Sequence, residues 1–144
     1  MTRIVIADDH AMFRQGLSLL LRSIEDIQVV GEADDGRKAL RLISELRPDL
    51  AILDLSMPEM SGIDVMRAVH REGCSTRVIL VTVHTMPEPA VEAIKEGVAG
   101  YLLKANAFED LLQAVETVRA AGPSSAIRYR RLSTAHPSLK PRMA

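Results

Sequence analysis

Three acidic residues stand at the ends of two apolar runs. Residues 3–7 lead into Asp8 and Asp9, and residues 50–53 lead into Asp54. Short apolar runs of this kind are typical of strands buried on both faces of a parallel sheet, and a carboxylate at the carboxyl end of such a strand lies in the crevice where open α/β sheets bind ligands. Three carboxylates there would repel one another unless a cation joined them, and Mg²⁺ prefers carboxylate oxygens, water and phosphate. The pattern predicts a Mg²⁺-assisted phosphoryl site with one aspartate as acceptor.

A hydroxyl and a cation end two further apolar runs. Residues 77–81 are followed by Thr82, and residues 100–103 are followed by Lys104. The hydroxyl would donate a hydrogen bond to a phosphoryl oxygen, and the ammonium would pair with the phosphate as a point charge. Taken singly, each residue is better explained as an ordinary strand-end threonine and a solvated lysine.

The acids also have simpler explanations. Asp8 and Asp9 would suit a helix N-terminus, where acids complement the helix dipole. Asp54 would suit an exposed loop cap, although a charge that ends an apolar strand costs desolvation unless it is used. The combination favours a site, because four of five strands bring acid, acid, hydroxyl and cation to one edge.

The elements that must position these residues alternate along the chain. Segments with a 3.6-residue apolar period separate the strands; the weakest surrounds Gly97 and is entered through Pro87 and Pro89. The alternation predicts a doubly wound α/β fold with helices on both faces. The predicted strands are 3–7, 28–33, 50–54, 77–82 and 100–103.

Composition limits the class of protein. The chain has 144 residues, of which 47% are hydrophobic and 3% aromatic, with no Trp, so we expect one soluble domain with an aliphatic core. No apolar stretch has the length of a membrane span and no signal peptide is visible. The single Cys74 forms no internal disulfide, and we expect a cytoplasmic protein with no membrane association.

The charge is divided unevenly. Residues 123–144 contain five basic residues and no acid, whereas residues 1–122 contain 13 basic and 19 acidic residues. The apolar period is also lost after residue 122. We therefore predict a folded domain over 1–122 and a basic, disordered tail or truncated linker over 123–144.

Three motifs identify a family. The segments 54–62, 8–17 and 100–104 resemble the receiver domain of bacterial two-component response regulators, and the last two are similar to the LuxR/NarL type. The resemblance covers residues 2 to about 121. It implies a five-stranded flavodoxin-like sheet in the order 2-1-3-4-5.

The resemblance also implies functional roles. A sensor histidine kinase would phosphorylate Asp54, the conformation would switch, and a phosphorelay would control transcription. The output surface would cover about 87–119, and a homodimer would form through helices one and five or four and five. The implied site consists of Asp54 as phosphoacceptor, Asp8, Asp9, Asp54 and the main-chain carbonyl of Ser56 as Mg²⁺ ligands, Thr82 and Tyr101 as switch residues, and Lys104 as the phosphate partner.

The chain departs from the family pattern in two places. Ala105 follows Lys104 where many receivers have a cis proline, and we expect a trans bond because a cis bond before Ala costs about 3–4 kcal/mol. No helix-turn-helix domain follows, so we do not expect this chain alone to bind DNA. A stand-alone receiver, a frameshifted gene and an excerpt of a longer protein all fit the sequence.

Two other functions compete with the receiver. A hydrolase with Asp54 as nucleophile would need an Asp-x-Asp motif and a substrate cap, but residue 56 is Ser and no insertion is long enough. A pseudo-receiver, which binds partners but no longer switches, would have lost an acid, the threonine or the lysine, and none is lost. We therefore expect a phosphoacceptor and not a turnover enzyme.

His84 would lie near the mouth of the site, where a solvated loop histidine is the simpler explanation.

Overall fold

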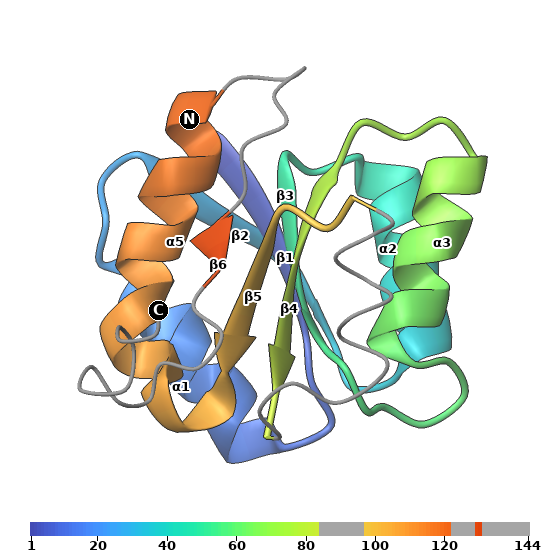
Figure 1. Cartoon of the computed structure of the whole chain (residues 1–144), viewed down its shortest axis with the longest axis horizontal. Coiled ribbons are helices and arrows are strands. Elements are labelled where there is room, and N and C mark those ends of the chain that lie inside the picture. The colour runs from blue at the N-terminus through green and yellow to red at the C-terminus, as the bar shows by residue number, and fades with distance from the viewer. Residues whose placement is uncertain (84–96, 122–128, 131–144) are drawn as a thin grey trace, which may run out of the picture.

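The fold is a parallel β-sheet between two layers of helices (Figure 1). A computed structural model describes residues 1–83, 97–121 and 129–130. The strand order is β2-β1-β3-β4-β5-β6, which confirms the predicted order of the first five strands. The strands are β1 (Thr2–Ala7), β2 (Ile27–Ala33), β3 (Leu50–Asp54), β4 (Arg77–Thr82), β5 (Gly100–Leu103) and β6 (Tyr129–Arg130).

The central strands are apolar because both of their faces are covered. Every residue of β3 and β5 is buried, as are five of the six residues of β4. Adjacent residues of β1 face opposite layers: Val5 packs with Ile43 in one apolar cluster, and Ile4 packs with Leu17 in the other. Burying one such side chain fully contributes roughly 1.5–3 kcal/mol, so the two clusters hold the helices on the sheet.

The helices divide into two pairs. Helices α1 (Ala11–Arg22) and α5 (Ala107–Ala121) cover one face, and α2 (Gly36–Leu46) and α3 (Gly62–Arg71) cover the other (Figure 1). A short 3-10 turn, η1 (Lys104–Asn106), leads from β5 into α5. The predicted helix around Gly97 falls almost entirely on residues 84–96, which lie outside the described residues.

Capping side chains mark the start of two of the helices. The side chain of Asp35 accepts a hydrogen bond from the Lys38 N–H at the start of α2, and Ser61 accepts one from the Asp64 N–H at the start of α3.

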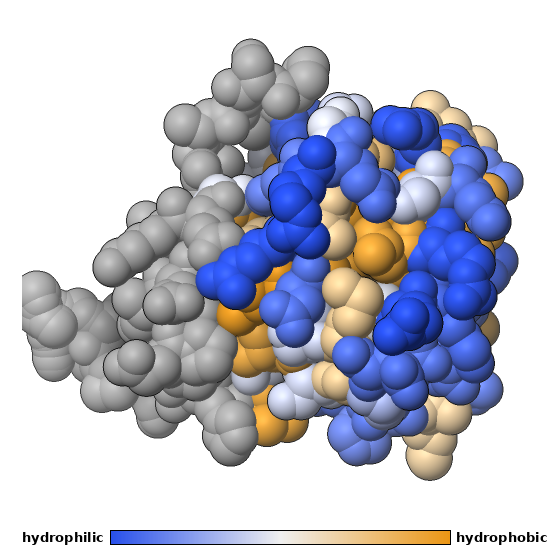
Figure 2. Space-filling view, turned by 90° about the vertical axis from the view of Figure 1, so that its right-hand side faces the viewer, coloured by the Kyte–Doolittle hydropathy of each residue, from blue (hydrophilic) through white to orange (hydrophobic). Residues whose placement is uncertain are grey.

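The exposed surface on the side of α3 is mainly hydrophilic, with hydrophobic residues near its centre (Figure 2). This distribution is expected of helices that place their apolar face on the sheet.

The sequence did not predict the sixth strand. Strand β6 pairs in parallel with β5, with Tyr129 opposite Gly100 and Arg130 opposite Tyr101. These two residues are the only part of the 123–144 segment that the structure describes, so the predicted disorder of that segment stays a prediction. Within the described ranges, none of the helices has the length and apolar character needed to cross a membrane.

Candidate functional site

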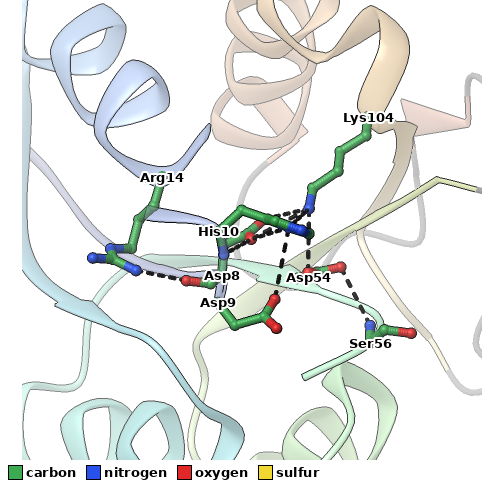
Figure 3. Close-up of polar contacts among 7 residues, drawn as sticks. All are labelled: Asp8, Asp9, His10, Arg14, Asp54, Ser56 and Lys104. Carbon is green, nitrogen blue, oxygen red and sulfur yellow. Dashed lines mark hydrogen bonds and ion pairs between the residues drawn. The ribbon is translucent and has the colours of Figure 1, made fainter. Parts of the chain in front are cut away.

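The parallel register brings the predicted site residues to one edge of the sheet. Ala7 at the end of β1 is paired with Leu53 on β3, so Asp8, just after β1, and Asp54, the last residue of β3, follow the paired residues at the same edge of the sheet. Thr82 at the end of β4 is paired with Leu103, directly before Lys104. Figure 3 shows Asp8, Asp54 and Lys104 converging on one point from three different elements.

Lys104 is the cation at the centre of the site. Its Nζ lies 3.1 Å from Asp8 Oδ2 and 3.4 Å from Asp54 Oδ2. The three side chains are 11%, 2% and 6% exposed, so water screens these pairs far less than it screens surface ion pairs. Two carboxylates and one ammonium leave the buried centre with an excess negative charge.

Burial and the excess charge both affect the protonation of Asp54. Together they raise the pKa of the Asp54 carboxyl from 3.8 to about 6, with burial as the larger cause and the nearby charge of Asp8 as the second. Lys104 and a hydrogen bond from the Ser56 N–H, at 3.2 Å from Asp54 Oδ1, lower the pKa in the opposite direction. The site therefore favours a group that withdraws or neutralises negative charge.

The acidic cluster fits a hard divalent cation. Asp8, Asp9, His10 and Asp54 each offer a ligand atom, and these atoms lie within 4.8 Å of one another. Asp8 Oδ2 is buried and, among the described residues, accepts no hydrogen bond of regular geometry. The Asp9 side chain is 37% exposed, which leaves one side of the cluster open to water. Carboxylate oxygens with access to water are the environment that Mg²⁺ prefers.

The start of α1 adds two residues whose role the sequence did not predict, His10 just before the helix and Arg14 in it. The His10 N–H donates to Asp8 Oδ1 at 2.8 Å, and His10 Nδ1 lies 2.9 Å from Lys104 Nζ. Arg14 donates from Nη1 to the Asp8 carbonyl oxygen at 2.7 Å (Figure 3). Its Nε donates to Glu32 on β2 at 3.2 Å. Both residues hold the loop that carries Asp8. Both lie within six residues after the acids and inside the 8–17 motif, which was the sequence signal for them.

Thr82 and Tyr101 lie behind the carboxylates in the sheet. Thr82 is 2% exposed and Tyr101 is fully buried. Burial raises the pKa of Tyr101 to about 12, while the Thr82 side chain has a smaller, opposite effect, although no hydrogen bond of regular geometry joins the Tyr101 hydroxyl to a described residue. The Tyr101 ring is thus already inside the protein. His84 lies outside the described residues.

The chain after Asp54 is fixed by main-chain contacts. The Leu55 N–H donates to the Val81 carbonyl at 2.8 Å, and the Gly62 N–H donates to the Leu55 carbonyl at 2.9 Å. A Cβ atom on Gly62 would lie 2.5 Å from the Asp54 carbonyl oxygen, so only glycine allows α3 to begin this close to β3. The Lys104–Ala105 peptide bond is trans, as predicted, since the described residues include no cis bond.

Comparison with known proteins identifies the family. Residues 4–116 match the response regulator receiver domain. The chain is 40% identical over 117 residues to the nitrate/nitrite response regulator protein NarL of Escherichia coli K12, covering 81% of this chain and 54% of that protein. The chain thus spans about half the length of the curated relatives it matches.

Two solved structures show the same fold. The signal receiver domain of the response regulator NarL from Mycobacterium tuberculosis is 40% identical, with a TM-score of 0.77 over 82% of this chain and 96% of that one. The isolated receiver domain of RcsB from Salmonella enterica serovar Typhimurium, in the presence of the phosphomimetic BeF3⁻, is 26% identical, with a TM-score of 0.79 over 90% and 92%. The fold, the matched segment and these relatives agree, and the chain belongs to the response regulator receiver domain family.

Proposed function

We propose that this chain accepts a phosphoryl group on Asp54 from the phosphohistidine of a sensor histidine kinase. One observation carries the proposal: Asp54 ends a buried strand with its carboxylate 3.4 Å from Lys104 Nζ and beside Asp8. A buried carboxylate with a raised pKa and one neighbouring cation is poorly stabilised as a free anion. It is well placed to become an acyl phosphate.

The chemistry follows from the charges. An Asp54 oxygen attacks the phosphorus, the phosphorus–nitrogen bond to the donor histidine breaks, and the imidazole leaves with a proton. In phosphoryl transfer the protein supplies mainly position and charge neutralisation. Lys104 would turn from the carboxylates to a phosphoryl oxygen, while the Ser56 N–H stays within reach of the acceptor oxygen.

Mg²⁺ is the cofactor that we propose for this site. Asp8, Asp9, Asp54 and the Ser56 main-chain carbonyl would hold it, and it would neutralise charge on the transferring phosphoryl group. The residues present fit this ion because the cluster combines carboxylates, a buried Asp8 oxygen that has, among the described residues, only an ion pair with Lys104, and an open side.

The proposed response is a shift between two conformations. Phosphate would favour the state in which Thr82 and Lys104 reach it, and the Tyr101 ring would fill the space behind Thr82. The output surface would lie within 87–119, of which 97–119 is described. Homodimerisation through α1 and α5 is supported by the exposed hydrophobic side chains of Leu19 and Phe108, which are 72% and 50% exposed.

We propose transcriptional control as the process that this chain serves. The relatives' names support it: one is a nitrate/nitrite response regulator, and a RcsB structure contains dimers bound to DNA. We do not propose DNA binding by the described residues themselves, which form the receiver. The single cysteine of the sequence supports a cytoplasmic location.

Intact-protein mass after incubation with acetyl phosphate and Mg²⁺ tests the proposal. Wild type should gain one phosphoryl group, and Asp54→Asn should gain none. Asp64→Asn is the matched control, because it makes the same change on an exposed turn of α3 and should be labelled like wild type. Labelling of Asp54→Asn at the wild-type rate would refute the site. Sustained turnover of a generic phosphate ester would instead favour a hydrolase.

A further inference from the structure

The ammonium of Lys104 has an aromatic neighbour in addition to its polar ones. Its Nζ lies over the ring of Phe13, 4.7 Å from the ring centroid. Phe13 lies in the first turn of α1 and is half-buried. A cation over the face of an aromatic ring at this distance is attracted by the negative potential of the π system.

The Phe13 ring is itself held by a second ring. Phe108, in the first turn of α5, lies with its centroid 5.5 Å from that of Phe13 and its plane tilted by 53°. Gly16 makes room for this pair, because a Cβ atom there would come within 2.8 Å of Phe108 Cζ. The ring over Lys104 is therefore fixed by contacts that do not involve the polar site.

This arrangement solves a problem that the carboxylates do not. Lysine carries its charge on a flexible four-carbon stem, and attraction to an ion has little directional preference. A further acid would hold the ammonium but would also compete with phosphate for it and add to the excess negative charge. An aromatic face attracts the cation, carries no net charge and occupies no metal-ligand position.

We propose that Phe13 is a positioning residue for Lys104: its ring, held by Phe108, keeps the ammonium within reach of the Asp54 carboxylate and of a phosphoryl group bound there. The proposal rests on the assignment of Asp54 and Lys104 made above. Phe13 touches neither the acceptor oxygen nor the phosphate and acts only through the lysine.

The first test is a contact test on the unmodified protein. Ring current from Phe13 should shift the ε-methylene protons of Lys104 upfield in the NMR spectrum, compared with those of Lys38, whose side chain is 54% exposed. The shift should persist in Phe13→Tyr and vanish in Phe13→Leu. A Lys104 signal at the Lys38 position in wild type overturns the proposal without any phosphoryl chemistry.

The second test measures affinity for BeF3⁻, a phosphoryl mimic, in the presence of Mg²⁺. Phe13→Leu keeps an apolar side chain but removes the ring, and should weaken BeF3⁻ binding about 2- to 30-fold, the range that corresponds to known cation–π strengths. Phe13→Tyr should stay within about twofold of wild type, because it keeps the ring.

A double-mutant cycle separates positioning from packing. If Phe13 acts through the ammonium, Phe13→Leu should change BeF3⁻ affinity less than about twofold when Lys104 is already replaced in Lys104→Met. An equal loss in both backgrounds would mean that Phe13 has only a packing role, and no loss in either would also overturn the proposal.

Failure of the proposed function would look different. If wild type took up no BeF3⁻, or if Asp54→Asn took up as much as wild type, the phosphoacceptor assignment and this proposal would fall together. If wild type bound it, Asp54→Asn did not, and Phe13→Leu matched wild type, the positioning role alone would be refuted.

Discussion

Replacing Asp54 with asparagine should make the Mg²⁺-free protein more stable at neutral pH, although it removes the proposed phosphoacceptor. Asparagine has nearly the same shape, and its single carbonyl oxygen can accept one of the two hydrogen bonds that the carboxylate accepts, from the Ser56 N–H on Oδ1 or from Lys104 on Oδ2. Lys104 keeps its ion pair with Asp8 at 3.1 Å. The change therefore removes one buried negative charge and leaves the remaining pair balanced.

The magnitude follows from the shifted pKa. Because the pKa of Asp54 is raised from 3.8 to about 6, the folded protein binds this proton more tightly than the unfolded chain does, so stability falls as the pH rises through this window. At 1.36 kcal/mol for each unit of pKa, wild type should lose about 2 kcal/mol between pH 4.5 and pH 7 through this group, and Asp54→Asn should not. The stability of the variant relative to wild type should grow by that amount.

Urea unfolding followed by far-ultraviolet circular dichroism, in EDTA at both pH values, measures this difference. Asp64→Asn removes an exposed acid and controls for the general effect of removing a carboxylate, so the pH dependence of Asp54→Asn is compared with that of this variant as well as with wild type. Saturating Mg²⁺ should reduce or reverse the advantage of Asp54→Asn, because the ion favours the carboxylate. A difference between Asp54→Asn and wild type that is equal at pH 4.5 and pH 7 would refute the reasoning.

Three further substitutions test other parts of the site. Lys104→Ala should fold, yet BeF3⁻ should no longer produce the amide chemical-shift changes across residues 97–119 that it produces in wild type; unchanged spectral responses would contradict the switch role. Gly62→Ala should cost about 1–3 kcal/mol in thermal unfolding, because its Cβ would meet the Asp54 carbonyl oxygen, whereas a Cβ in Gly31→Ala would meet only the flexible ends of Leu42 and Leu46 and should cost less. Ser61→Ala removes the α3 cap and should cost about 1 kcal/mol, while the exposed Ser75→Ala should be neutral; equal effects would rule out the capping contribution.

The strands and their contribution to the site could be predicted because both depend on local pattern. Buried parallel strands are continuously apolar, so a polar residue such as Asp54 marks the strand end and the site edge at once. Strands β3, β4 and β5 have the predicted bounds, and β1 and β2 begin one residue earlier than predicted. The predicted order of these strands is confirmed as well.

Side-chain contacts between distant elements could not be predicted in the same way. Whether His10 and Phe13 face Lys104 depends on the angle at which α1 leaves β1 and on how α5 packs beside it, and neither has a short-range signature. Strand β6 is a similar case, since the alternation of Ile127 and Tyr129 with Arg128 and Arg130 is too short to indicate a strand. Apolar period identifies elements, whereas contacts such as these need the packed structure.

The burial of Tyr101 has a practical consequence. The chain contains two tyrosines and no tryptophan, and Tyr101 lies fully buried in β5 next to the site residues. The near-ultraviolet signal of Tyr101 is therefore expected to report on a rigid chromophore behind the proposed phosphoacceptor. Tyr129 is the other tyrosine of the sequence. The protein thus carries its own optical reporter, and occupancy of the site can be followed without labels and without adding a residue.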